Sequence, residues 1–391
     1  MNNITFLTEN NIKKFILNGK IDSSNSEEIL AYVSNKVFAD DSVKLDFDKV
    51  SYISSAGLRF VLKIAKSCKD FEVINVSPNV YDIFDMTGFN QMIKVSKAMR
   101  VISIEGKELI GEGYMGKVYR LDEDTIIKVF VRNSSIEDIQ REIGLAKKAF
   151  VAGLPTAIPF DVVRVKEGGY GSVFELLKSN CFNKLFINHP ENTDKYIKMY
   201  IDLLKTIIDT TIEDPSLLPS KKDLAYEWIE ADRKYNLFDE ETLTKLTKLV
   251  DSIPGSNHLV HGDFHIKNIM MQGDDPLLID MDTLGVGHPI FEFTAFFLTY
   301  IGYPSTDPGN IESFLGISQE VANRLFYESV NTIYADRSEI ERKEIIDKCS
   351  LLGYMWLAGK TMQFDPDDKL RVSHAQDEVL RLINKYDSLN F

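Results

Sequence analysis

One short segment of the chain combines the side chains that phosphoryl transfer needs. Residues 261–268 read His-Gly-Asp-Phe-His-Ile-Lys-Asn, and a second acidic cluster, Ile-Asp-Met-Asp, follows at 279–282. Phosphoryl transfer needs an Asp that orients the acceptor hydroxyl and takes its proton, and further oxygen ligands that hold a magnesium ion. Asp263, Asn268 and Asp280 match these needs.

The elements around these residues would bring them together. A D-x-x-x-x-N loop carries Asp263 and Asn268 on one short segment, and the apolar run at 277–279 predicts a strand that delivers Asp280 beside them. The alternative is a polar surface turn followed by an ordinary strand. The spacing of the three residues favours the catalytic interpretation.

A glycine-rich segment lies upstream of this loop. Residues 110–118 fit G-x-G-x-x-G-x-V and lie between two runs that are typical of a β-hairpin. Glycines at 111, 113 and 116 lack a Cβ, so backbone N–H groups near Gly111, Gly113 and Gly116 could approach phosphate oxygens. The pattern is weak by itself, because glycine-rich turns between strands occur in several nucleotide-binding folds.

A lysine and an acid add to the predicted phosphate site. The run Ile-Ile-Lys-Val at 126–129 is similar to the strand lysine of kinases, so Lys128 would pair with the α- and β-phosphates. Such a lysine has to be held by an acid on a neighbouring helix. Residues 135–150 show the apolar spacing of a helix, and Glu142 on that helix is the expected partner, with Glu137 as the alternative.

Together these motifs resemble the kinase-like superfamily, and in particular its aminoglycoside phosphotransferase and choline kinase branch. That branch uses an H-G-D-(aromatic or Leu)-H-x-x-N loop and an I-D-x-acid strand, as at 261–268 and 279–282. Protein kinases instead place an activation segment that ends in A-P-E after the metal Asp. Here only residues 283–289 separate the acidic strand from the next helix-like run, which favours a small-molecule acceptor over a protein.

The resemblance implies a bilobal α+β protein kinase-like fold with a mostly helical C-lobe, and ATP and Mg²⁺ as cofactors. It makes Asp263 the catalytic base, Asn268 and Asp280 the magnesium ligands, and Lys128 the phosphate clamp. In such enzymes the second acid of the strand often lies near the metal or the acceptor. Asp282 holds that position, and its alternative role is structural.

The resemblance also places the hinge between the lobes at 173–177, where the backbone from Glu175 onward would contact adenine. The two loop histidines, His261 and His265, are expected to hydrogen-bond the backbone rather than to transfer protons. The acceptor site has no specific signature. Its aromatic candidates, Trp228 and Trp356, are expected to be packing residues.

The first hundred residues have the pattern of a separate α/β unit. Short alternating strands are followed by amphipathic helices at 27–37 and 56–67, with a strand-to-helix turn at 52–59. Together with the segments 17–22 and 86–89, this turn resembles a STAS domain, the fold of anti-sigma factor antagonists. Such a domain has a mixed sheet with helices, and the resemblance implies a protein partner.

One serine of this unit falls on a regulatory position. Members of the STAS family that work by partner switching carry a D-S-(S/A)-G-L pattern whose Ser is phosphorylated by a cognate kinase. Ser55 occupies that position, and Ser54 stands where the family has an acid. A Ser before a helix is more commonly only a cap. Phosphorylation of Ser55 is therefore a hypothesis.

Length and composition are consistent with two domains. We expect a STAS-like domain at 1–100 and an aminoglycoside phosphotransferase-like kinase domain at 101–391, with an N-lobe at about 101–177 and a C-lobe at about 178–391. Acidic residues outnumber basic ones by 59 to 45, for a formal charge of −14, and this argues against a nucleic-acid partner.

The cysteines and the N-terminus bear on the compartment. The three cysteines are widely spaced without a metal-ligand pattern, which is typical of thiols in a reducing compartment. The first residues lack a basic region followed by an apolar one, and no run approaches the roughly twenty apolar residues of a membrane span. We expect a cytoplasmic protein without membrane contact.

Three functions are consistent with these features. The leading one is an ATP- and magnesium-dependent phosphotransferase that acts on a small-molecule hydroxyl, with the STAS unit recruiting or regulating it. The second is a binding module in which nucleotide sensing alters the availability of the STAS face to a partner of an anti-sigma type pathway. The third is a protein serine kinase whose acceptor is Ser55 or a homologous serine.

Overall fold

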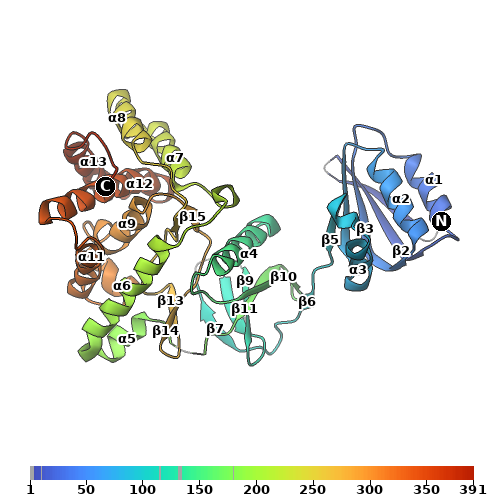
Figure 1. The fold of residues 1–391 in the computed structure, drawn as a ribbon, viewed down its shortest axis with the longest axis horizontal. Coiled ribbons are helices and arrows are strands. Elements are labelled where there is room, and N and C mark those ends of the chain that lie inside the picture. Colours follow the sequence, from blue (N-terminus) through green and yellow to red (C-terminus); the bar gives the residue numbers. More distant parts are fainter. Residues whose placement is uncertain (1–3, 10, 114–115, 131–133, 179) are drawn as a thin grey trace. The chain divides into compact units, whose positions relative to one another are not determined.

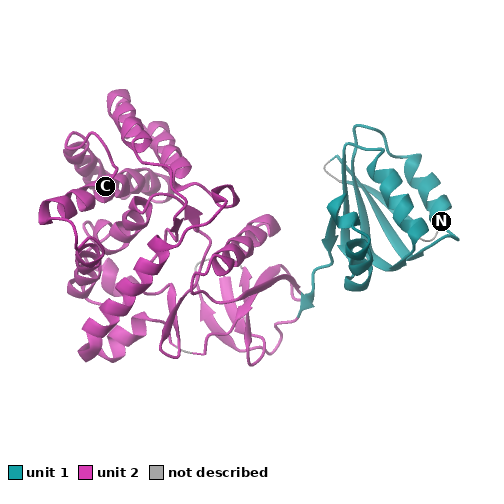
Figure 2. Ribbon diagram, viewed as in Figure 1, with its two compact units in different colours: residues 1–102 teal, residues 103–391 magenta. Residues whose placement is uncertain are grey.

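The computed structural model divides into two compact units, residues 1–102 and 103–391 (Figure 2). The structure describes residues 4–9, 11–113, 116–130, 134–178 and 180–391.

The first unit is built on a five-stranded sheet in the order β1-β2-β3-β4-β5, with β1 antiparallel to β2 and the other neighbours parallel. The strands are β1 (Ile4–Glu9), β2 (Ile12–Ile21), β3 (Ser42–Ile53), β4 (Asp70–Val76) and β5 (Lys94–Lys97). The helices are α1 (Ser26–Ser34), α2 (Ser55–Ala65) and α3 (Pro78–Met86), with a 3₁₀ turn, η1 (Phe89–Gln91).

The core of this unit follows the two-residue period of its strands. Phe15 and Leu17 on β2 and Leu45 and Phe47 on β3 are fully buried, because side chains at alternate positions of a strand face the same side of the sheet. Val61 of α2 belongs to the same core. The α/β class expected for this unit is confirmed.

Ser54 and Gly57 define the start of α2. The Ser54 Oγ accepts hydrogen bonds from the backbone N–H groups of Ala56 and Gly57 at 3.2 and 3.4 Å, so Ser54 is the N-cap. A Cβ on Gly57 would lie 2.8 Å from the carbonyl oxygen of Ile21, so the helix can only start this close to β2 with a glycine there. Ser55, the first residue of the helix, is exposed.

The second unit begins with five sheet strands in the order β10-β11-β9-β8-β7. They are β7 (Leu109–Glu112), β8 (Gly116–Arg120), β9 (Thr125–Phe130), β10 (Pro159–Val165) and β11 (Tyr170–Glu175); the two-residue strand β6 (Val101–Ile102) ends the range of the first unit. Helix α4 (Ile136–Val151) packs on β10 and β11 (Figure 1). It starts at a capping box in which Ser135 and Asp138 each satisfy the other's backbone N–H.

The rest of the second unit is mostly helical, as the sequence predicts. Its helices are α5 (Asn183–Asn188), α6 (Thr193–Asp209), α7 (Lys221–Lys234), α8 (Glu240–Asp251), α9 (Ile290–Phe297), α10 (Asn310–Leu315), α11 (Gln319–Ile333), α12 (Glu339–Phe364) and α13 (Lys369–Leu382). Short helical turns are η2 (Pro190–Asn192), η3 (Pro215–Leu217) and the π-helical η4 (Leu298–Gly302). Two small antiparallel pairs join β12 (Leu259–Val260) to β15 (Gly285–Val286) and β13 (Ile269–Gln272) to β14 (Asp275–Leu278).

An aromatic cluster in this helical part anchors the 261–268 segment. Phe264 is fully buried and stacks on Tyr200 of α6, with ring centroids 4.4 Å apart. The Tyr200 hydroxyl donates to the carbonyl of Phe264 at 3.2 Å, and the Tyr300 hydroxyl accepts the N–H of Ile266 at 3.1 Å. The loop is thus fixed at its centre by buried contacts. Among the described helices, none combines the length and the apolar character that a bilayer-spanning segment needs.

Candidate active site

A hairpin explains why the two acidic segments meet. Asn268 immediately precedes β13, and Ile279 immediately follows β14. Because the two strands pair antiparallel with Ile269 opposite Leu278, their outer ends coincide. The N–H of Ile279 donates to the carbonyl of Asn268 at 2.9 Å, which continues the ladder by one step. Asp280 is the next residue, so the chain returns it to the loop that carries Asp263.

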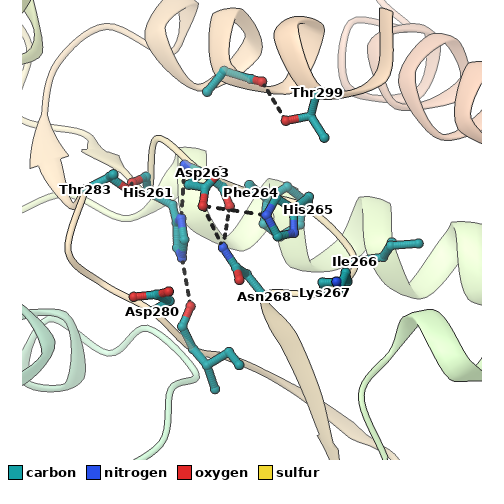
Figure 3. A network of polar contacts seen from close by, with 12 residues as sticks. His261, Asp263, Phe264, His265, Ile266, Lys267, Asn268, Asp280, Thr283 and Thr299 are labelled. Carbon is teal, nitrogen blue, oxygen red and sulfur yellow. Dashed lines mark hydrogen bonds and ion pairs between the residues drawn. The ribbon is translucent and has the colours of Figure 1, made fainter. Parts of the chain in front are cut away.

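Asp263 is held from two sides and remains partly accessible. The Asn268 amide nitrogen donates to both the backbone carbonyl and the Oδ2 of Asp263, at 3.0 and 2.9 Å, and the His265 Nε2 lies 3.6 Å from the same Oδ2 (Figure 3). Burial raises the pKa of Asp263, but its contacts with His265 and Asn268 outweigh burial, so this pKa lies below its usual value. The side chain is 44% exposed, so an ionised carboxylate faces open space.

The hydrogen bonds of Asn268 fix the direction of its amide. Both partners on Asp263 are oxygen acceptors, so the NH₂ group must face them. The amide oxygen of Asn268 then points away from Asp263, as Figure 3 shows, and no hydrogen bond to it is recorded in the described residues. Asn268 can therefore offer a neutral oxygen ligand without losing its structural bonds.

Asp280 adopts a backbone conformation that non-glycine residues rarely use. Its φ is +64°, in the left-handed region, which stores strain of about 1–3 kcal/mol and is most common at functional sites. Its Oδ1 lies 3.4 Å from the Lys128 Nζ, and its side chain is 40% exposed. Asp280 is therefore partly exposed, with one oxygen still uncommitted in the described residues.

Lys128 joins the sheet of the second unit to α4 and to Asp280. Its Nζ lies 2.8 Å from the Glu142 Oε1, in a partly buried ion pair. Burial lowers the pKa of Lys128, but the carboxylates of Asp280 and Glu142 outweigh burial and hold it above its usual value. Glu137 is exposed in the first turn of α4, so of the two acids considered from the sequence the structure brings Glu142 to the lysine.

The three glycines of the glycine-rich segment have different surroundings. A Cβ on Gly116 would lie 2.2 Å from the carbonyl oxygen of Val129, so the pairing of β8 with β9 requires a glycine there. A Cβ on Gly113 would have no neighbour within 4 Å, and one on Gly111 would make only ordinary contact with Val118. The Gly113 N–H donates to the Gly116 carbonyl at 2.9 Å, and residues 114–115 lie outside the described chain.

Glu175 ends β11 at the expected hinge. Its carboxylate accepts the N–H of Ile158 at 3.2 Å, and the Gln272 Nε2 lies 3.4 Å from its other oxygen. Its own N–H donates to the Ile158 carbonyl, and the Leu176 N–H donates to the Asp124 carbonyl. These two N–H groups already donate to backbone carbonyls, so any contact of Glu175 with adenine would come from its backbone carbonyl.

Of the two loop histidines, His261 makes the backbone hydrogen bonds that the sequence predicted for both, whereas the His265 ring makes none in the described residues and its Nδ1 is buried without a partner. His261 is fully buried, its Nδ1 accepts the N–H of Asp263, and its Nε2 therefore carries the hydrogen that points to the Ile279 carbonyl at 3.3 Å. Burial lowers the pKa of His261 to about 4, so the ring is neutral near pH 7. His265 is also buried, lies edge-on to the ring of Phe314, and contacts Asp263.

The second acid of the strand lies close to this cluster. Burial, and after it the charge of Asp280, raises the pKa of Asp282 to about 7. The Arg141 guanidinium donates to the backbone carbonyl of Asp282 at 3.3 Å. Asp282 is therefore an acid whose charge depends on which cations are near it.

Lys221, at the start of α7, is a site residue that sequence reasoning missed. It is only 7% exposed, donates from its Nζ to the Thr283 carbonyl, and lies against Gly262, whose φ of +79° turns the loop around it. Burial lowers the pKa of Lys221 to about 8, although Glu292 and Asp282 oppose this. A lysine that follows a helix cap usually faces solvent, so its sequence context carried no signal.

A cavity of about 550 Å³ opens beside Asp263. Helices α7, α9 and α12 contribute Trp228, Phe291 and Trp356 to its wall, and Tyr303 and Phe314 add further rings. Both tryptophans also pack against the core, as the sequence suggested, but they do more than pack. The site thus has a charged end, around Lys128, Asp263 and Asp280, and an aromatic chamber, which is this cavity.

The described residues contain no cluster of three or more His, Cys, Asp or Glu side chains that could hold a metal. Magnesium is usually bound by one or two carboxylates, with water and substrate phosphates completing its shell. The uncommitted oxygens of Asn268 and Asp280 fit that kind of site.

Family comparisons agree with this architecture. Residues 108–314 match the phosphotransferase enzyme family, and residues 3–100 match the STAS domain family. A curated protein of Bordetella bronchiseptica, named "Putative anti-sigma factor antagonist BtrV", is 32% identical over 87 residues, which cover 21% of this chain and 75% of that protein.

Solved structures with a similar arrangement include the gentamicin-APH(2")-IIa complex, which is 18% identical and covers 81% of this chain and 98% of that one, with a TM-score of 0.45. Another is the aminoglycoside phosphotransferase APH(2'')-Ib with ADP bound, also 18% identical, covering 77% of this chain and 97% of that one, with a TM-score of 0.43. The fold class expected from the sequence, a STAS domain followed by a kinase-like fold, is confirmed.

Proposed function

Because the chain belongs to the phosphotransferase enzyme family, we propose that its second unit transfers the γ-phosphoryl group of ATP to a hydroxyl of a small molecule. The observation that carries this proposal is the geometry at Asn268: its amide nitrogen donates to Asp263, its amide oxygen has no partner in the described residues, and the β13–β14 hairpin returns Asp280 to the same loop. The STAS domain would recruit or regulate this activity.

The charged end of the site would bind the nucleotide. Lys128 is already aligned by Glu142 and would pair with the phosphates, while the backbone at Gly111, Gly113 and Gly116 would cover them. Asn268 and Asp280 would hold Mg²⁺, which supplies charge neutralisation for the phosphates when it is bound. The backbone carbonyl of Glu175 would face the adenine ring. Asp282 would lie near the metal or the acceptor.

Asp263 would act on the acceptor. The acceptor hydroxyl donates a hydrogen bond to the Asp263 carboxylate, which orients its oxygen toward the γ-phosphorus. As the new O–P bond forms, the bond between the γ-phosphorus and the ADP oxygen breaks, and the hydroxyl proton passes to Asp263 and then to water. A carboxylate with a lowered pKa is ionised at neutral pH and so is ready for this role.

The cavity supports a small-molecule acceptor. Its volume of about 550 Å³ lies in the range of pockets that enclose metabolite-sized ligands. Between Asp282 and α9 the chain has only seven residues, 283–289, which leaves little room for a segment that would hold a peptide.

The test is an acceptor-dependent assay of ADP release with Asp263→Asn as the diagnostic variant. Asn at 263 retains the shape of the side chain and an oxygen that can accept from Asn268, so we expect ATP affinity and folding close to those of the wild type. Transfer should fall by about 10²-fold or more, because the base is lost. Turnover at the wild-type rate in Asp263→Asn would remove the proposed base.

A second candidate function concerns the STAS domain. Ser55 is exposed at the start of α2, whereas Ser54 makes the cap, so a kinase could reach Ser55. We propose that phosphorylation at Ser55 controls binding of a protein partner to this domain. Incubation of the chain with ATP, and separately with a cognate kinase, followed by mass spectrometry would detect the modification. A phosphate found only at other residues in both experiments would reject it.

A further inference from the structure

The cavity beside Asp263 has an unusual balance of charge for a site that would take a cationic acceptor. Among its lining residues the single carboxylate is that of Asp263, which the proposed reaction reserves for the hydroxyl. Two lysines, Lys221 and Lys360, line the same cavity. Most other lining side chains are apolar or aromatic. The lining itself thus carries two lysines against one carboxylate.

The positive charge of Lys221 is largely compensated by groups of the protein itself. Its ammonium donates to the Thr283 carbonyl, and the carboxylates of Glu292 and Asp282 both act on it electrostatically. Lys221 thus belongs to the charged end of the site.

Lys360 has no such compensation. It lies on α12 one turn after Trp356, and its Nζ lies 5.8 Å from the Trp356 ring centroid and 4.4 Å from that of Phe364. Across the described part of the chain, no carboxylate oxygen lies within 4.0 Å of this ammonium, and no hydrogen bond from it is recorded. Burial alone lowers its pKa, without an acid to oppose that effect.

Partial burial of a cation is unfavourable unless an anion or a set of hydrogen-bond acceptors compensates its charge. Aromatic faces supply part of that compensation. The remainder would come from a ligand, because Lys360 is one of the residues that line the cavity into which a ligand would fit. Aminoglycosides such as kanamycin carry several ammonium groups and would instead add positive charge next to Lys360.

We propose that the acceptor carries an anionic group, a carboxylate or a phosphate, on an apolar body that also bears the hydroxyl, and that Lys360 selects this group. The inference rests on the proposed function, since it names the substrate class of the same cavity. In the bound state the anion pairs with Lys360, the apolar body lies between the rings of Trp228 and Trp356, and the hydroxyl reaches Asp263.

The chain provides its own reporter for the test. Its only two tryptophans, Trp228 and Trp356, both line this cavity, so intrinsic fluorescence reads binding there directly. Three probes share one ring and one hydroxyl and do not absorb at the excitation wavelength. They are trans-4-(hydroxymethyl)cyclohexane bearing a carboxylate, a methyl group or an aminomethyl group at C1. Kanamycin is a fourth, polycationic probe.

In the full chain we expect the carboxylate probe to bind about tenfold more tightly than the methyl probe, as for one partly exposed ion pair, and the amine and kanamycin to bind more weakly still. Lys360→Gln should abolish the advantage of the carboxylate, and Lys360→Glu should transfer it to the amine. Lys343→Gln, an exposed position on the same helix and outside the cavity, should change nothing. Equal affinities, a preference for the amine, no binding of any probe, or an unchanged preference in Lys360→Gln would each overturn the inference.

A second measurement separates this inference from the proposed function. ADP release is followed with the carboxylate probe and ATP, in the wild type and in Asp263→Asn. Charge-selective binding through Lys360 without any transfer would uphold the inference on the ligand class and count against the proposed transfer. Transfer that depends on Asp263 but shows no charge selection by Lys360 would do the reverse.

Discussion

The amide of Asn268 donates to the backbone carbonyl and to the carboxylate of Asp263 from a single nitrogen, at 3.0 and 2.9 Å. This contact fixes the position of the proposed base and at the same time frees the amide oxygen on the opposite side. In the proposed reaction one side chain would therefore serve both the base and the metal.

Replacing this amide by a carboxylate should be costly. Asn268→Asp would place a second acid against two oxygen acceptors, and we expect the free energy of unfolding at pH 7 to fall by about 2–3 kcal/mol, the cost of unpaired buried polar groups. The deficit relative to the wild type should shrink as the pH falls, because one proton can then bridge the two carboxyl groups. Urea denaturation followed by tryptophan fluorescence reports on the second unit alone, which contains both tryptophans. Asn257→Asp is the control, since the exposed Asn257 side chain donates, among the described residues, only to the Ile212 carbonyl. An equal loss in both variants would contradict the role assigned to Asn268.

Two glutamates on α4 provide a matched pair for the phosphate clamp. Glu142→Gln removes the charge that holds Lys128, so we expect the dissociation constant for ATP in the presence of Mg²⁺ to rise about tenfold or more. Glu137→Gln changes the same charge on an exposed turn and should leave ATP binding unchanged. Displacement of a fluorescent ATP analogue measures both. Equal effects would show that Glu142 is not the specific partner.

The glycine-rich segment offers a second matched pair. Gly116→Ala would force a methyl group to within 2.2 Å of the Val129 carbonyl oxygen, so the strands must separate, and we expect a loss of about 1–3 kcal/mol in unfolding free energy. Gly113→Ala enters open space and should leave stability nearly unchanged. Thermal unfolding of the two variants side by side provides the comparison. A stable Gly116→Ala variant would mean that β8 and β9 can relax at little cost.

His261 predicts how the second unit responds to acid. Its folded pKa, about 4, lies below the ordinary value of 6.5, so the unfolded chain binds this proton first as the pH falls. The contribution of His261 to the free energy of unfolding is therefore complete above about pH 6.5. It is lost progressively toward pH 4, by about 3 kcal/mol for a fully buried imidazole. His261→Asn retains an acceptor for the Asp263 N–H and removes the titration. Denaturation curves at several pH values should show a smaller slope in that variant. An unchanged slope would assign the effect to other groups such as His288, whose pKa burial also lowers to about 4.

The residues that the sequence brought together most securely are those joined by short loops. Asp263 and Asn268 lie on one segment, and Asp280 follows a hairpin whose register is set by local pairing. The choice between Glu142 and Glu137 needed more, because both lie on the same helix and only its packing against the sheet decides which faces Lys128. Helical periodicity indicates a buried face but gives no direct measure of distance across a lobe.

The acceptor cavity could not be predicted in the same way. Its wall joins Lys221 and Trp228 of α7 to Trp356 and Lys360 of α12, and the packing of these two helices is a long-range property of the fold. A lysine at a helix start and a tryptophan on an apolar face both have ordinary explanations in isolation. That they line one cavity together with Asp263 becomes evident only when the helices are assembled.

The β13–β14 hairpin has two arms of equal length, its two strands, and their pairing sets the position of Asp280. Gln272 and Asp275 pair next to its turn, while Asn268 and Ile279 meet at its open end. Adding the same number of residues to both strands would keep Asn268 and Ile279 opposite each other. One residue added to a single strand would instead rotate Asp280 out of reach. It is thus the matching of the arms, and not the count of residues between Asn268 and Asp280, that this site must preserve.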